Sequence, residues 1–134
     1  MSRVAFGLIV AAGLFNLAFA VFHLFFWRLF NWQQELARLG MANRGIMQVL
    51  NLCMAYVFAV TAAVLLLFPG EIAGTEFGRF LLVASAGLWL FRAILQPMFF
   101  GLQHSLSAAL FAVFIFGTLI HGLAWWLVRA VSAI

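Results

Sequence analysis

The residues that could do chemistry are polar side chains embedded in very apolar sequence. Arg44, Gln48 and Asn51 follow one another at spacings of four and three residues, which places them on one face of a helix. Arg92 and Gln96 repeat the four-residue spacing later in the chain. Guanidinium groups bind carboxylates and phosphates through paired hydrogen bonds, so this pattern predicts a site for an anionic group. With neighbouring imidazole, amide and indole groups included, the candidate ligand-binding residues are His23, Arg44, Gln48, Asn51, Trp89, Arg92, Gln96 and His104.

Catalysis and cofactor binding have fewer candidates. If a reaction takes place, we expect His23 or His104 to act as the general acid or base, because imidazole titrates near neutral pH. The sequence has three histidines and no His-Glu-x-x-His motif, so we expect no metal site. The cofactor stays unknown. A b-type haem is a lesser alternative, with His23 and His104 as axial ligands and Arg44 and Arg92 near the propionates.

The composition excludes a water-soluble domain. Of the 134 residues, 68% are hydrophobic and 7% are charged, whereas soluble domains are roughly half apolar and about a quarter charged. The seven basic residues are all arginines scattered through apolar sequence, so the net charge of +4 does not indicate a nucleic-acid partner. The single cysteine, Cys53, excludes a disulfide within the chain. Membrane lipid is therefore the expected partner.

Four apolar stretches are each long enough to cross a bilayer, which takes about 20 residues. They cover about residues 4–30, 45–68, 77–96 and 104–128, and the second and third end at Pro69 and Pro97. Short connections favour antiparallel neighbours, so we predict an all-α polytopic membrane protein with an antiparallel bundle of four transmembrane helices. Residues 1–134 would form this single domain, with a short interfacial amphipathic helix at about 32–39. The spacing of Asn31 and Gln34 is that of a capping box at its start.

The alternation of the spans places the candidate residues at similar depth. His23, the start of the second span, the end of the third span and His104 all fall in the same half of the membrane. Because an ionisable side chain inside the membrane costs about 2.5–3.5 kcal/mol, this convergence predicts a polar pocket in one leaflet. On the fourth span, a seam with alternating three- and four-residue spacing should face the other helices. Its members are His104, Ser107, Phe111, Phe114, Thr118, His121 and Trp125.

The alternative interpretation is that these groups only join helices. We expect the small polar residues within the spans to form interhelical hydrogen bonds, including Asn51, which is also a candidate ligand-binding residue. Arg92 could stack on Trp89. Glu35 could pair with Arg44 or Arg92, and that arginine would then serve a structural ion pair instead of a ligand. The residues expected to join helices are Asn16, Asn51, Ser85 and Thr118.

The expected function is to bind or move a small anionic or amphiphilic ligand, such as a lipid headgroup, a quinone or an organic acid. The alternative is a non-catalytic accessory or assembly subunit of a larger membrane complex. A homo-oligomer is also expected, because four spans enclose little space. The two sides carry three arginines each; with Arg44 assigned to the site, the positive-inside rule favours both termini in the cytoplasm, for a protein of an inner or plasma membrane.

Overall fold

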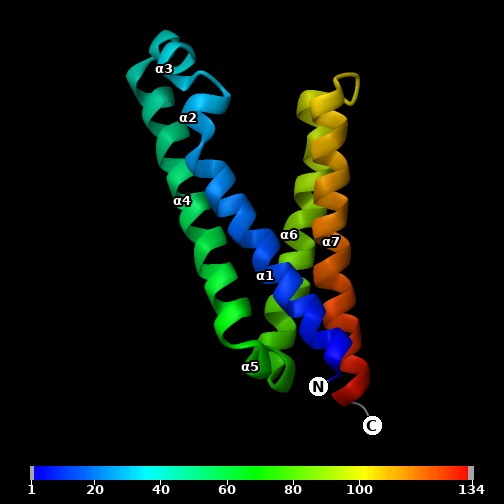
Figure 1. The fold of residues 1–134 in the computed structure, drawn as a ribbon. Coiled ribbons are helices and arrows are strands. Elements are labelled where there is room, and N and C mark those ends of the chain that lie inside the picture. Colours follow the sequence, from blue (N-terminus) through cyan, green and yellow to red (C-terminus); the bar gives the residue numbers. More distant parts are fainter. Residues whose placement is uncertain (1, 133–134) are drawn as a thin grey trace. The chain divides into compact units, whose positions relative to one another are not determined.

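The computed structural model describes residues 2–132, which are helical over almost their whole length and contain no strand (Figure 1). Four long helices are each long and apolar enough to cross a membrane, which confirms the predicted helical class and number of spans. Four short helical segments connect them. The long helices are α1 (Arg3–Leu24), α4 (Met41–Leu67), α6 (Glu76–Phe100) and α7 (Ser105–Ser132), and the short ones are α2 (Phe26–Leu29), α3 (Trp32–Glu35), the 3₁₀ helix η1 (Leu36–Arg38) and α5 (Pro69–Gly74).

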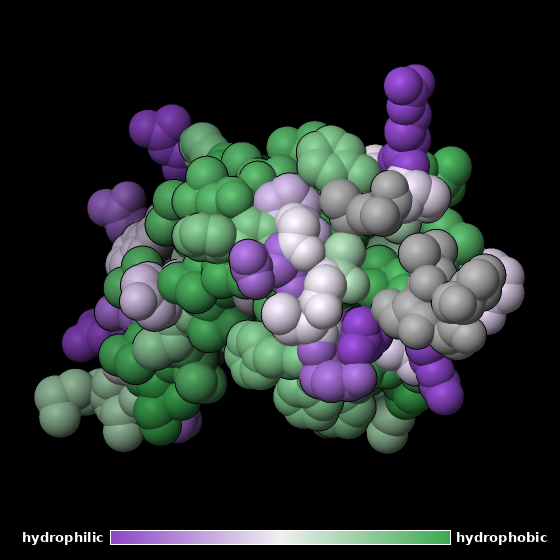
Figure 2. Space-filling view, turned by 90° about the horizontal axis from the view of Figure 1, so that it is seen from below, coloured by the Kyte–Doolittle hydropathy of each residue, from purple (hydrophilic) through white to green (hydrophobic). Residues whose placement is uncertain are grey.

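The surface of the chain is largely apolar. Figure 2 shows hydrophobic residues over most of one face, with hydrophilic residues in separate patches between them. Large side chains such as Phe77 and Phe80, both on the long apolar helix α6, are 72% and 66% exposed. Exposure of this kind is unfavourable in water and favourable in lipid. The helices and this surface together indicate a membrane protein.

The first span ends earlier than predicted. Helix α1 stops at Leu24 rather than at Phe30, and α2 begins at Phe26 after a turn in which the Phe25 N–H donates to the Phe22 carbonyl at 3.1 Å. The run from Phe25 to Trp27 is entirely aromatic, and aromatic residues are weaker helix formers than leucine or alanine. A break of this kind cannot be predicted from hydropathy, because the residues on both sides of it are apolar.

The predicted helix at 32–39 is present as two short pieces, α3 and η1. Trp32 and Leu36 are buried, whereas Glu35 and Arg38 are exposed, so the segment is amphipathic as expected. The capping box does not form. Asn31 has a positive φ of 47°, and its side-chain amide donates to the Gln34 side chain at 3.0 Å instead of to the helix backbone. Asparagine tolerates this left-handed conformation better than most residues do.

Pro97 does not end the third span. Helix α6 continues to Phe100, and the N–H of Gly101 donates to the Pro97 carbonyl at 3.1 Å. Proline costs the helix one hydrogen bond, but in the last turn few further bonds depend on it. Gly101 then leaves the helix with a φ of 64°, a conformation that glycine adopts without strain.

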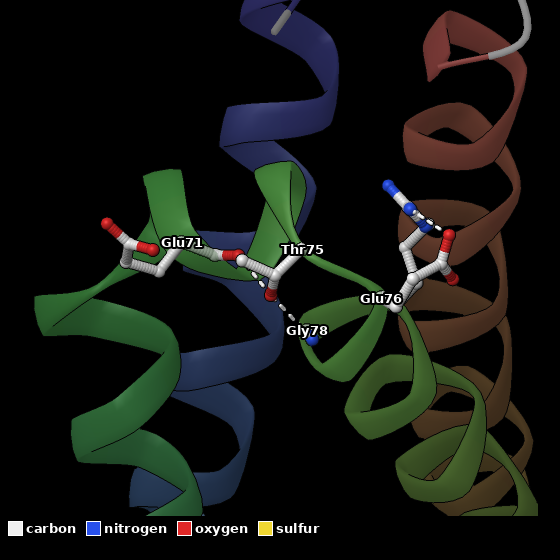
Figure 3. A network of polar contacts seen from close by, with 5 residues as sticks. Glu71, Thr75, Glu76 and Gly78 are labelled. Atoms are coloured by element: carbon white, nitrogen blue, oxygen red, sulfur yellow. Dashed lines mark hydrogen bonds and ion pairs between the residues drawn. The ribbon is translucent and has the colours of Figure 1, made fainter.

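The connection between the second and third spans is a short helix, α5. Pro69 opens α5, and Thr75 links it to α6 (Figure 3). The Thr75 hydroxyl donates to the Glu71 carbonyl at 2.8 Å and accepts the N–H of Gly78 at 3.0 Å, as an N-cap residue does. A β-carbon on Gly78 would lie 2.2 Å from the Ile72 carbonyl oxygen, so only glycine fits this close approach.

The chain falls into two compact units: residues 13–64, and residues 1–12 together with 65–134. In the unit of residues 13–64, α1 contacts α4 through Phe19 and Phe58, whose ring centroids are 5.9 Å apart. In the other unit, α6 and α7 lie side by side along their length (Figure 1). Their contacts run in reverse order along the chain, with Trp89 against Phe114 and Gln96 against Ser107.

Candidate ligand-binding site

Arg92 lies on α6 against the aromatic side chains of the α6–α7 unit. Its guanidinium carbon is 4.3 Å from the ring centroid of Phe114 and 5.7 Å from that of Phe100. Trp89, one turn earlier on α6, stacks on Phe114 with a centroid distance of 6.1 Å and an interplanar angle of 18°. The structure thus places Phe114 and Phe100, rather than the expected Trp89, as the cation–π partners of Arg92.

Within the described residues of its own unit, Arg92 has no carboxylate partner. The sequence contains three acidic residues. Glu35, in the unit of residues 13–64, pairs with Arg38 at 3.3 Å rather than with Arg44. Glu76 pairs with Arg79 and lies sixteen residues before Arg92, which is about 24 Å along a helix. Glu71 lies on α5, before Glu76, which opens α6 (Figure 3).

Gln96 lies one turn after Arg92 and joins α6 to α7. Its side chain is 1% exposed, and its amide nitrogen donates to the Ser107 hydroxyl at 2.8 Å and to the Ser107 carbonyl at 3.5 Å. The Ser107 hydroxyl in turn donates to the Gly101 carbonyl in a short hydrogen bond. The other end of the amide, Oε1 of Gln96, is buried and has no hydrogen-bond partner within residues 2–132.

His104 lies outside the helix that it was expected to open. It is exposed, in the connection of residues 101–104, and α7 begins at the next residue. Its backbone carbonyl still accepts the N–H of Ala108 at 3.0 Å. The other six members of the predicted seam, from Ser107 to Trp125, are buried or half-buried, so the seam is confirmed on α7 itself.

His23 and Asn51 form a reciprocal pair in the unit of residues 13–64. The Asn51 amide nitrogen donates to the His23 backbone carbonyl at 2.9 Å, and Oδ1 of Asn51 is 2.8 Å from Nδ1 of His23. Because Oδ1 can only accept, Nδ1 carries the proton and a neutral ring presents Nε2 as its acceptor nitrogen. The His23 ring also stacks on Phe26, with centroids 4.4 Å apart. This pair is the interhelical bonding expected of Asn51.

Arg44 and Gln48 lie one turn apart on α4, near its beginning. Arg44 is exposed and Gln48 is half-buried. The structure therefore brings together His23 with Asn51, and Trp89, Arg92 and Gln96 along α6 with α7. A single pocket shared by both groups stays a prediction.

Thr118 and His121 bond within their own helix. The Thr118 hydroxyl donates to the Phe114 carbonyl at 3.0 Å, and Nδ1 of His121 is 2.7 Å from the Gly117 carbonyl oxygen. For Thr118, this local bond takes the place of the expected interhelical one. Asn16 and Ser85 are buried, and the interhelical bonding expected of them stays a prediction.

Sequence reasoning missed four contributors to the site around Arg92. Phe114 and Ser107 were recognisable as seam residues, but their pairing with Arg92 and Gln96 needs the register of the two helices. Phe100 and the Gly101 carbonyl carry no signal in the sequence, since the helix was expected to end before them. No group of three or more histidine, cysteine or acidic side chains that could hold a metal ion occurs within residues 2–132.

Comparisons of this chain with known protein families, with curated proteins and with solved structures find no match.

Proposed function

We propose that this chain is an integral membrane protein that binds the anionic headgroup of a membrane amphiphile, with Arg92 as the partner of the anion. The observation that carries the proposal is a half-buried guanidinium on an apolar helix, with two aromatic rings beside it and no ion pair to a described carboxylate of its own unit. A positive charge in this setting favours the binding of an anion from outside the chain.

The energetics favour an external anion. A charged side chain within the membrane costs about 2.5–3.5 kcal/mol, whereas cation–π contacts contribute about 0.5–2 kcal/mol. A phosphate or carboxylate would compensate the remaining cost through charge-assisted hydrogen bonds, which the planar guanidinium can make in pairs. The apolar surface beside the site, with Met98 and Phe99 69% and 75% exposed, suits the tail of an amphiphile.

The finer arrangement is part of the same proposal. The four spans form an antiparallel bundle in a single domain, with both termini in the cytoplasm of an inner or plasma membrane and α3 and η1 in the interface. The Arg92 site then lies in the leaflet opposite the termini, where His23, Arg44, Gln48 and His104 would orient the ligand or assist its movement. Copies of the chain would associate in the membrane.

The test compares lipid-dependent stability of three proteins purified in detergent and stripped of lipid. The wild type should melt at a higher temperature when phosphatidylglycerol is added than when phosphatidylcholine is added. Arg92→Gln should lose this difference. Arg129→Gln is the matched control, because Arg129 also lies over an aromatic ring, Trp125, at 5.5 Å, and it should behave like the wild type.

Two other outcomes would overturn the proposal. Equal stabilisation of wild type and Arg92→Gln, together with co-purification of other subunits at fixed stoichiometry, would instead establish the accessory role. A Soret band in the absorption spectrum, lost on replacement of His23 or His104, would establish haem binding.

A further inference from the structure

We propose that the headgroup bound at Arg92 also carries a hydroxyl group, which donates a hydrogen bond to Oε1 of Gln96. The ligand class is thus a hydroxylated phosphodiester lipid, such as a phosphatidylglycerol, rather than any anionic lipid. This inference rests on the proposed function of Arg92 and adds the second contact that selects among anions.

The orientation of the Gln96 amide follows from its neighbours. The Ser107 hydroxyl has one hydrogen, and it points to the Gly101 carbonyl. The same oxygen must therefore accept a hydrogen bond from Gln96, whose nitrogen is 2.8 Å away. The Ser107 carbonyl oxygen lies 3.5 Å from the same nitrogen and is also an acceptor, so it too favours the amide nitrogen of Gln96 at this position. A flipped amide would set two acceptors against each other, so Oε1 is fixed on the side away from Ser107.

A fixed and buried acceptor without a partner selects for a donor. Gln96 is 1% exposed and Oε1 makes no hydrogen bond within the described residues. Buried polar groups are almost always hydrogen-bonded, and leaving one unpaired is unfavourable. A bare phosphate monoester oxygen or a carboxylate could satisfy Arg92 but would be repelled by Oε1. A headgroup hydroxyl beside the phosphate satisfies both.

Flexible side chains lie one turn to either side of Gln96 along α6. Arg92, Gln96 and Phe100 follow one another at four-residue spacing, so they share one face of α6. The Arg92 guanidinium reaches forward to within 5.7 Å of the Phe100 ring centroid, and Phe100 is 62% exposed. We infer that these two side chains cover Gln96. An anion that draws the guanidinium away from the Phe100 ring would uncover Oε1.

The experiment compares two lipids that differ only in the hydroxyl groups. Phosphatidylglycerol and phosphatidylpropanol with identical acyl chains carry the same single negative charge, and only the first has headgroup hydroxyls. Each is titrated into the wild-type protein in nanodiscs of phosphatidylcholine, and binding is measured by the change in tryptophan fluorescence. The wild type should bind phosphatidylglycerol about tenfold more tightly, the effect of one hydrogen bond to an otherwise unpaired acceptor.

Two variants separate the two contacts. Gln96→Met removes the acceptor at similar size and should bind both lipids equally. Arg92→Gln should weaken the binding of both. If Gln96→Met does not fold, the comparison of the two lipids on the wild type still decides the question.

Each failure has a distinct meaning. Equal affinity of the wild type for both lipids, with both lost in Arg92→Gln, overturns the hydroxyl contact and leaves the proposed function standing. Binding that does not depend on Arg92 overturns the proposed function itself. Soluble glycerophosphoglycerol should compete poorly because it lacks acyl chains. Competition by it at the same concentration as the lipid would overturn the assignment to a lipid in favour of a soluble phosphodiester.

Discussion

Replacing Gly78 by alanine tests the close approach of α6 to α5. The new β-carbon would lie 2.2 Å from the Ile72 carbonyl oxygen, 2.4 Å from its α-carbon and 2.6 Å from its carbonyl carbon. Non-bonded heavy atoms prefer separations of about 3.5–4.0 Å, so the two backbones would have to separate by about 1 Å. All three contacts are with backbone atoms, which cannot rotate away as a side chain can.

The magnitude follows from two opposing effects. Overpacking costs about 1–3 kcal/mol, and alanine gains about 0.5–1 kcal/mol over glycine in a helix. Separating the two segments would also strain the hydrogen bonds of Thr75 to Glu71 and Gly78, which are 2.8 and 3.0 Å long. We expect a net loss of about 1–2 kcal/mol in the free energy of unfolding. Each kcal/mol corresponds to a decrease of about 2–8 °C in the melting temperature.

The assay is thermal unfolding in one detergent, followed by circular dichroism, with Gly87→Ala as the control. Gly87 lies on the same helix, and nothing lies within 4 Å of a β-carbon placed there. That variant should be as stable as the wild type or more stable by up to about 1 kcal/mol. Equal melting temperatures of Gly78→Ala and Gly87→Ala would contradict the close approach of Gly78 to Ile72.

Two further predictions concern single hydrogen-bonding residues. Thr75→Ala should destabilise the chain by about 0.5–2 kcal/mol in thermal unfolding, because the N–H of Gly78 loses its capping oxygen. Thr75→Ser keeps a hydroxyl and should restore the stability. A Ser variant no more stable than the Ala variant would argue against capping. Asn51→Leu should cost about 1–2 kcal/mol, since it removes two interhelical hydrogen bonds to His23. A double-mutant cycle with His23→Leu should give a coupling energy of at least about 0.5 kcal/mol, and strictly additive losses would contradict the pairing.

Much of the fold could be predicted because a bilayer imposes a minimum apolar length. The four long helices follow from that constraint alone. The seam on α7 was also predictable, since helical periodicity shows in the spacing of residues such as Ser107, Phe114 and His121. His104 shows the limit of this argument. It continues the spacing of the seam but lies before the first residue of α7. Outside a helix, helical periodicity does not determine the direction in which a side chain points.

The details of the site could not be predicted because they depend on backbone geometry and helix register. The sequence indicates that Arg92 and Gln96 share a face, but not that Phe114 and Ser107 lie opposite them. The extension of α6 past Pro97 brings Phe100 to the guanidinium and places the Gly101 carbonyl beside Ser107. Both contacts were excluded by the expectation that proline ends the helix.

The most direct test of the central proposal is to count the anionic lipids that stay bound to the protein. Wild type, Arg92→Gln and Arg129→Gln are extracted from the same membranes in mild detergent and analysed by native mass spectrometry. We predict that an anionic phospholipid stays with the wild type and with Arg129→Gln and is lost from Arg92→Gln. Equal retention of that lipid by all three proteins would contradict the assignment of Arg92 as the partner of the anion.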